Sequence, residues 1–252
     1  MRKAISILRS FYIRLKYVSS DIYQVLRLLV NNSSSKTIYI GDSHIWYIAA
    51  EKESTKISRI YFNSNGDLIL WLGPKLMYTI GIKGFEFNLL QKLSLLIANK
   101  KNYNNLVAHF GEIDCRVWSS KLDNMEKIEL VSKRYISRIE NLSSFYGLAR
   151  SVLISPIPPS DRGQTNLDFP KNGSLATRVQ VTARITLSLE ANQNINMIKV
   201  LNSQRLVGSN TIGPDFGSLS AVFTLDSCHV NKKGAEIIKR NLNELLFDAT
   251  RL

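Results

Sequence analysis

Short apolar runs alternate along the chain with longer segments in which apolar residues recur every three to four positions. The runs have the β-branched and aromatic content of buried strands and lie at residues 37–40, 59–62, 68–72, 106–110, 151–154 and 195–201. The periodic segments predict amphipathic helices at residues 85–101, 122–146, 174–190 and 235–247. Strands that alternate with helices predict an α/β fold, a three-layer α/β/α sandwich with a central parallel sheet.

The connection at residues 156–173 is long and rich in Pro, Gly, Ser, Asp and Asn. Loops of this length are functional or disordered. This loop follows a predicted strand, and open α/β sheets bind their ligands beyond the carboxyl ends of strands. A second excursion with Gly and Ser spans residues 203–224.

Residues 1–35 precede the first predicted strand and have a bias of their own. Six Lys and Arg residues stand against the single Asp21 in residues 1–30, a formal balance of +5. Charges interrupt the apolar stripe, so the segment predicts an amphipathic helix rather than a membrane span or signal peptide. It can pack on the domain, be a flexible leader or lie on an anionic membrane surface. We expect a basic, helical extension over 1–35 and one domain over 36–252, with the first 30 residues dispensable for the fold.

Two polar blocks carry candidate chemistry. Gly41–His44 ends the first predicted strand, so Ser43 begins a helix whose N-terminus favours negative charge, although Ser43 can also be a simple N-cap. Asp226–His229 precedes the last predicted helix. An Asp and a His three residues apart can point the same way, so that the carboxylate orients the imidazole that takes a serine proton. We expect both blocks on the same rim of the sheet.

Together the two blocks resemble those of the SGNH (GDSL-type) hydrolase superfamily, whose first block is Gly-Asp-Ser and whose last is Asp-x-x-His. The resemblance implies a flavodoxin-like SGNH hydrolase fold and a serine esterase that needs no cofactor. Ser43 would be the nucleophile, His229 the base and Asp226 the residue that orients it. The resemblance spans roughly residues 37 to 245.

The middle blocks of the superfamily imply an oxyanion hole. Besides the Ser43 N–H, Gly73 is the candidate for the glycine donor of the second block. The third block, Gly-x-Asn-Asp, corresponds to Gly111–Asp114, where Ile113 replaces the asparagine that donates to the oxyanion. Arg116 is the candidate substitute; alternatively it binds an anionic substrate, or pairs with Glu112 or Asp114. The candidate substrate-binding residues are Asp42, His44, Glu112, Asp114 and Arg116.

Charge and composition limit the classes of binding partner that we expect. The chain has 252 residues and a net charge of +13, but no run of Lys and Arg exceeds two, so we expect no nucleic acid partner. A diffuse positive field suits an anionic glycan, a phosphorylated or lipid-linked substrate, or an anionic membrane. It is equally typical of a basic surface without a special partner.

Cysteine and histidine usage predicts neither disulfides nor a metal site. Cys115 and Cys228 are expected to be free thiols of a reducing compartment, which predicts a cytoplasmic protein, peripheral to the membrane if residues 1–30 bind one. The three histidines and two cysteines do not have the sequence spacing of metal ligands. His109, within a predicted strand, is expected to be a satisfied core or edge residue.

Three functions remain open. The first is a carbohydrate esterase that deacetylates a glycan, and the second is an O-acetyltransferase that acts on a bacterial surface polysaccharide or its precursor. The third is a catalytically weak glycan-binding protein. Ile113 indicates this alternative because it cannot donate to an oxyanion as the superfamily's asparagine does. Sequence does not show whether water or a sugar reaches the acyl-enzyme.

Overall fold

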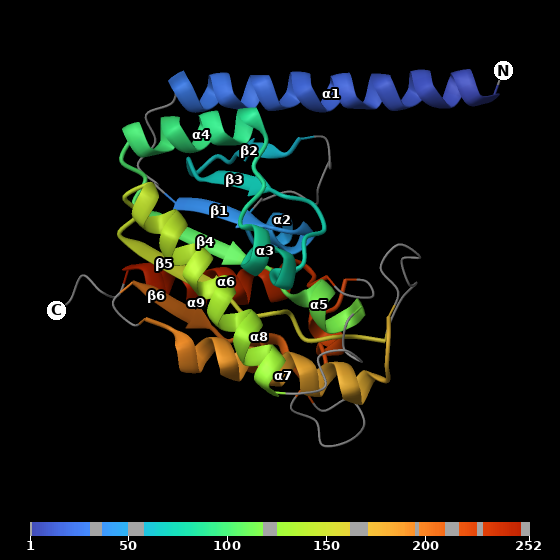
Figure 1. Ribbon diagram of the computed structural model, residues 1–252, viewed down its shortest axis with the longest axis vertical. Coiled ribbons are helices and arrows are strands. Elements are labelled where there is room, and N and C mark those ends of the chain that lie inside the picture. Colours follow the sequence, from blue (N-terminus) through green and yellow to red (C-terminus); the bar gives the residue numbers. More distant parts are fainter. Residues whose placement is uncertain are drawn as a thin grey trace.

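The computed structural model describes residues 2–30, 37–49, 58–117, 125–161, 171–194, 197–209, 217–225 and 229–247. Within them lies a six-stranded sheet of order β2-β3-β1-β4-β5-β6 (Figure 1). Its strands are β1 (Thr37–Gly41), β2 (Ile60–Phe62), β3 (Leu68–Trp71), β4 (Asn105–His109), β5 (Arg150–Ile154) and β6 (Ile198–Leu201). Five strands run parallel, which confirms the predicted α/β fold. The edge strand β2 is antiparallel to β3 because a tight turn joins the two strands as a hairpin.

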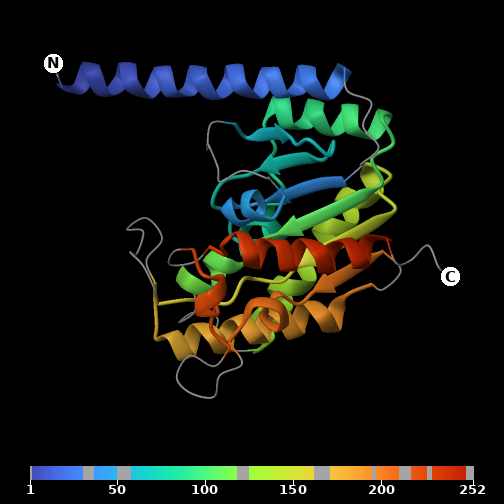
Figure 2. The ribbon, with the colours of Figure 1, turned by 180° about the vertical axis from the view of Figure 1, so that it is seen from behind.

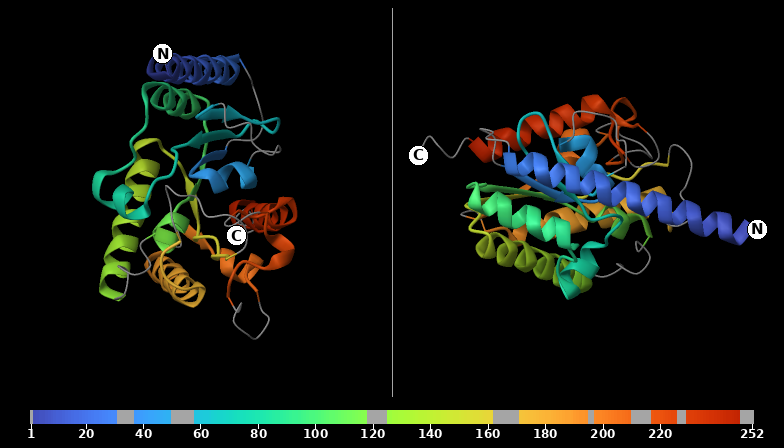
Figure 3. Two further views of the ribbon diagram at one scale, coloured as in Figure 1. Left: turned by 90° about the vertical axis from the view of Figure 1, so that its right-hand side faces the viewer. Right: turned by 90° about the horizontal axis from the view of Figure 1, so that it is seen from above.

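Helices cover both faces of the sheet and make the three predicted layers (Figures 2 and 3). One face carries α1 (Arg2–Val30), α3 (Met77–Lys83), α4 (Leu89–Lys100), α6 (Met125–Phe145) and α7 (Leu175–Asn192). The other carries α2 (Ser43–Ala49), α8 (Ser203–Val207) and α9 (Lys232–Phe247). Alternate strand residues supply the two cores: Ile38 and Ile40 face the first, and Tyr39 faces the second.

Three short helices were not predicted, α3, α5 (Glu112–Val117) and α8, because five to seven residues are too few for a clear helical period. The helix predicted from residue 85 begins at Leu89 instead. Asn88 accepts the Gln91 N–H, and the Gln91 side chain accepts the Asn88 N–H. This capping box satisfies two N–H groups and fixes the start of α4.

The parallel strands alone follow the order β3-β1-β4-β5-β6, which is the 2-1-3-4-5 order of flavodoxin-like folds. The order reverses between β1 and β4, and such a switch point is where these folds place ligands. Gly41, the last residue of β1, lies opposite Trp71 of β3 and His109 of β4. Two residues further along, Ser43 therefore begins α2 at this edge of the sheet.

Gly41 is required where β1 turns into α2. A Cβ at this position would lie 2.8 Å from Ile45 Cβ and 2.9 Å from the His109 carbonyl oxygen. Both distances are below van der Waals contact, so a larger residue would push α2 away from β4. The glycine thus lets Ser43 approach the switch point closely.

The helix α1 is one continuous element of 29 residues and is more than an extension. Val25 and Leu28 are buried in the first core. Asp21 accepts the Ser58 hydroxyl and the Arg59 N–H at 2.6 and 2.7 Å. The last third of α1 thus packs against the core beside β2, and whether residues 1–30 are dispensable for the fold stays a prediction. The N-terminal half runs past the domain (Figure 1).

Candidate active site

Ser43 and His229 meet at the switch point. Ser43 Oγ lies 2.8 Å from His229 Nε2, although 186 residues separate them in sequence. Ser43 is the first residue of α2, and His229 lies in the loop before α9. The predicted proximity of the two side chains is confirmed. Asp226, predicted to orient His229, lies outside the described residues, as does Cys228.

Backbone contacts fix the loop that carries His229. The Leu225 N–H donates to the His229 carbonyl oxygen at 2.9 Å. Asn231 Oδ1 accepts the Gly234 N–H at 3.0 Å, and Asn231 Nδ2 donates to the Val222 carbonyl oxygen at 2.8 Å. Asn231 thus caps α9 and ties it to the preceding 3-10 turn, so the position of His229 is set by its neighbours on both sides.

Two rings of α2 pack against the His229 ring. The centroid of His44 lies 4.7 Å from that of His229, and the centroid of Tyr47 lies 4.7 Å from it as well. His44 and Tyr47 are three residues apart and share a face of the helix. One helix therefore supplies the hydroxyl and both ring neighbours. Sequence reasoning missed Tyr47; its spacing of four from Ser43 was the available signal.

All three histidines of the chain gather here. The rings of His44 and His109 lie 5.0 Å apart, and His109 Nδ1 lies 3.3 Å from Asp42 Oδ1. Asp42 Oδ1 also accepts the His44 N–H. The histidines are distant in sequence but adjacent in space, which spacing alone did not indicate. Among the described residues no group of His, Cys, Asp and Glu is arranged to hold a metal ion.

Burial sets the charges of this cluster. Burial alone would raise the pKa of the Asp42 carboxyl, but the charge and hydrogen bond of His109, together with His44, hold that pKa below its ordinary value. Burial lowers the pKa of His44 well below its ordinary value, and the charge of His229 lowers it further against the opposing effect of Asp42. Asp42 is therefore anionic and His44 neutral at pH 7.

Glu112 and Arg116 form a buried ion pair on α5. Arg116 Nε lies 3.1 Å from Glu112 Oε1, and the two side chains are 8% and 5% exposed. Glu112 Oε2 lies 3.9 Å from His44 Nε2. Burial raises the pKa of Glu112, and the nearby Arg116 and His229 counteract it. The pairing predicted as one alternative for Arg116 is present; donation to an oxyanion stays a prediction.

Asp114 supports a neighbouring helix. Its carboxylate accepts the N–H groups of Met77 and Tyr78 at 2.7 and 3.1 Å. These are the first residues of α3, whose N-cap Leu76 makes no side-chain cap bond. Burial raises the pKa of Asp114 to about 7, although both hydrogen bonds oppose the rise. Like Asp42 and Glu112, Asp114 has contacts with the protein itself, and substrate binding by these residues stays a prediction.

The backbone N–H groups of Ser43 and Gly73 are the predicted donors of the oxyanion hole. Gly73 has φ +77°, and a Cβ there would meet nothing within 4 Å. Ser43, as the first residue of α2, has no intrahelical acceptor for its N–H. Ile113 is buried and has no donor to offer. Donation by the Ser43 and Gly73 N–H groups to an oxyanion stays a prediction.

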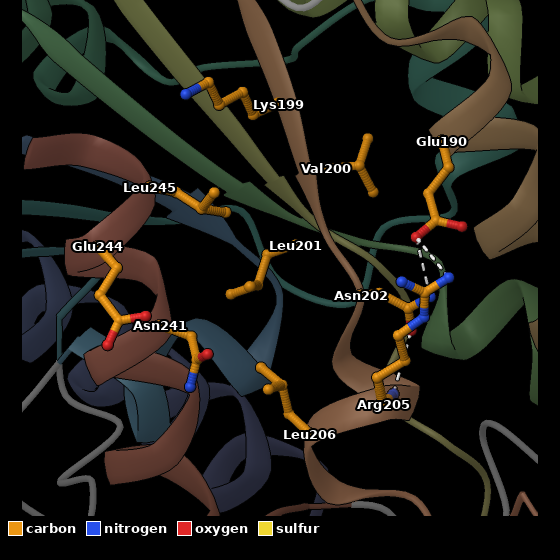
Figure 4. Close-up of a pocket in the computed structure, with 10 residues that line it drawn as sticks. All are labelled: Glu190, Lys199, Val200, Leu201, Asn202, Arg205, Leu206, Asn241, Glu244 and Leu245. Atoms are coloured by element: carbon orange, nitrogen blue, oxygen red, sulfur yellow. Dashed lines mark hydrogen bonds and ion pairs between the residues drawn. The ribbon is translucent and has the colours of Figure 1, made fainter. Parts of the chain in front are cut away.

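A separate groove of about 350 Å³ lies beside β6, between α7, α8 and α9 (Figure 4). At its edge Glu190 Oε1 accepts from Asn202 Nδ2 at 3.0 Å and lies 4.0 Å from Arg205 Nη2. The lining residues are Glu190, Lys199, Val200, Leu201, Asn202, Arg205, Leu206, Asn241, Glu244 and Leu245. None of these lining residues contacts Ser43 or His229 in the arrangement described above, so this groove is distinct from the candidate active site.

Solved structures share this fold. A protein from Streptococcus pneumonia, provisionally named a platelet activating factor, superposes with a TM-score of 0.53 at 13% identity, over 98% of this chain and 100% of that chain. The carbohydrate acetylesterase Est24 from Sinorhizobium meliloti superposes with a TM-score of 0.51 at 11% identity, over 86% and 100%. No protein-family model and no curated protein matches the sequence. At these identities the likeness establishes the fold.

Proposed function

We propose that the chain is a serine-dependent acyl-ester hydrolase of the SGNH type that removes acetyl groups from a glycan. The observation that carries this proposal is the 2.8 Å contact between Ser43 Oγ and His229 Nε2. A serine hydroxyl within hydrogen-bond reach of an imidazole, at the ligand-binding switch point of an α/β sheet, is the arrangement of an activated nucleophile.

In this mechanism Ser43 Oγ attacks the ester carbonyl carbon while His229 Nε2 takes its proton. The tetrahedral intermediate collapses when the C–O bond to the sugar breaks and His229 returns the proton to the leaving alkoxide. Water then attacks the acetyl-enzyme, again with His229 as base, and releases acetate. Asp226, three residues before His229, would hold the imidazole in the required tautomer.

The oxyanion would be held by the N–H groups of Ser43 and Gly73. Loss of one donor costs roughly 2.7–4 kcal/mol of transition-state stabilisation, so Ile113 leaves a deficit relative to a three-donor hole. We assign Arg116 as the compensating group. Its charge already acts on the site, because it contributes to the low pKa of His44.

Asp42, His44 and His109 would be buried residues that hold Ser43 and His229 in position. A neutral His44 beside His229 leaves the base free to accept a proton, and anionic Asp42 holds His109 and the start of α2 in place. The net charge of +13 favours an anionic glycan. The shared fold with the carbohydrate acetylesterase Est24 is compatible with this substrate class.

Acetate release from an acetylated glycan tests the proposal. The purified chain should release acetate, and Ser43→Ala should reduce release to background while it retains the fold. The assay should be run with and without a non-acetylated acceptor glycan. Acetyl groups that appear on the acceptor instead of as acetate would replace hydrolysis by O-acetyl transfer. Glycan binding without any acyl chemistry would leave only the binding function.

A further inference from the structure

The helix α1 presents an apolar stripe to the outside. Six large residues, spaced three or four apart, are each between 45% and 66% exposed: Tyr12, Leu15, Val18, Ile22, Leu26 and Leu29. With about 100° of rotation per residue, they fall within an arc of roughly 120°. We call this set the α1 stripe. An exposed apolar patch with this regularity marks an interaction surface.

The α1 stripe is not the face that packs on the domain. Among the α1 residues whose burial the structure describes, the buried ones are Asp21, Gln24, Val25 and Leu28, each at most 8% exposed. Gln24 Oε1 accepts the Phe62 N–H of β2 at 3.1 Å, which fixes the rotation of the helix. At about 100° per residue the two faces are centred roughly 120° apart. The core therefore uses one face of α1 and leaves the stripe outward.

The charge of α1 distinguishes between possible occupants. Asp21 is the only acidic residue among residues 1–30, and it is buried against Ser58 and the N–H groups of Arg59 and Ile60. The basic residues of the same segment are Arg2, Lys3, Arg9, Arg14, Lys16 and Arg27. A second copy of the helix would bring only like charges together. An anionic lipid surface complements both the apolar stripe and the positive charge.

We propose that α1 docks on an anionic membrane surface through the α1 stripe, lying in the plane of the interface. No described helix is long and apolar enough to cross a membrane. The N-terminal half of α1 extends past the domain on the side where β1 and β4 end, which is the side of Ser43 (Figures 1 and 2). Docking along the stripe holds that side of the domain near the lipid headgroups. The proposal is independent of the enzymatic activity proposed above.

Vesicle sedimentation with the full chain tests this docking. One set of vesicles contains phosphatidylglycerol and phosphatidylcholine in equal parts, and the other contains phosphatidylcholine alone. The test variant is Leu15→Ser/Leu26→Ser, which removes apolar area from the stripe without changing charge. The matched control is Phe145→Ser/Leu187→Ser, which removes two residues that are 74% and 58% exposed on α6 and α7. Circular dichroism verifies that each variant keeps its helix content.

The wild-type chain and the control should bind the phosphatidylglycerol vesicles, and the stripe variant should bind at least about tenfold more weakly. Phosphatidylcholine alone should bind little, and added salt should weaken binding because the lipid charge is screened. Absence of wild-type binding, or equal binding by the stripe variant, overturns the proposal. A wild-type dimer that the stripe variant loses, without vesicle binding, overturns it in favour of a second copy of the chain.

Discussion

The ring of Tyr47 packs against the ring of His229 with centroids 4.7 Å apart and planes tilted by 36°. Because Tyr47 lies on the helix that Ser43 begins, it links the orientation of the His229 ring to the position of the Ser43 hydroxyl. Aromatic pairs contribute about 0.5–1.5 kcal/mol beyond burial. We predict that Tyr47→Ala lowers kcat by a few-fold to about tenfold, whereas Tyr47→Phe, which keeps the ring, stays near wild type. Equal losses in both variants would assign the role to the hydroxyl instead.

Substitution of Leu28 tests how much the packing of α1 contributes to the stability of the domain. Leu28 is fully buried, and Leu26, on the same helix, is 54% exposed. We predict that Leu28→Ala lowers the free energy of unfolding by about 2–5 kcal/mol. Leu26→Ala should change it by no more than about 0.5 kcal/mol. Urea denaturation of both variants checks this, and a Leu28→Ala variant as stable as Leu26→Ala would mean that α1 is detachable.

Asp114 predicts a pH dependence of stability. Its pKa is about 7 in the folded chain and 3.8 without burial, so the folded state binds the proton more tightly than the unfolded state. Its contribution to stability is therefore present below about pH 4 and is lost as the pH rises towards about 7. We predict that Asp114→Asn gains stability relative to wild type over this range, by a few kcal/mol at most, with no further gain above it.

Urea denaturation of wild type and Asp114→Asn at a series of pH values gives this difference directly. The opposite slope, with wild type gaining on the variant as the pH rises, would show that the hydrogen bonds from Met77 and Tyr78 outweigh burial and keep Asp114 ionised. In that case the carboxylate would act as a charged cap of α3.

Variants of Arg116 test whether its guanidinium replaces the side-chain donor that Ile113 cannot supply to the proposed oxyanion hole. We predict that Arg116→Ala lowers turnover by more than about tenfold, equivalent to about 1.4 kcal/mol or more. Arg116→Lys should recover only part, because an ammonium does not reproduce the planar guanidinium. Glu112→Gln is the control, since it removes the ion pair but keeps Arg116. Rates should be corrected for the folded fraction, because an unpaired buried Glu112 also destabilises the chain.

An equal loss of corrected turnover in Glu112→Gln and Arg116→Ala would mean that the intact ion pair, and not donation by Arg116 itself, supports turnover. Unchanged turnover in Arg116→Ala would show that the backbone donors of Ser43 and Gly73 suffice. Either result would contradict the assignment of Arg116 as the group that compensates for Ile113.

Local patterns predicted the sheet and the meeting of Ser43 with His229, because strand composition, helix periodicity and short polar blocks are local signals. Tyr47 and His109 were missed as site neighbours because their proximity depends on the register of β1 with β4 and on the packing of α2. The burial of Leu28 was missed for a related reason. An amphipathic period shows that a helix has an apolar face, but not which partner covers it.

Covalent labelling of Ser43 tests whether His229 activates the Ser43 hydroxyl, on which the proposed hydrolase mechanism depends. A fluorophosphonate reacts with a serine hydroxyl only when a base activates it, and peptide mass mapping locates the adduct. We predict one adduct on the wild-type chain, at Ser43, that is absent in Ser43→Ala. It should form more than about a hundredfold more slowly in His229→Ala and at the wild-type rate in Ser174→Ala. An adduct at another serine, no adduct, or labelling of Ser43 that does not depend on His229 would contradict it.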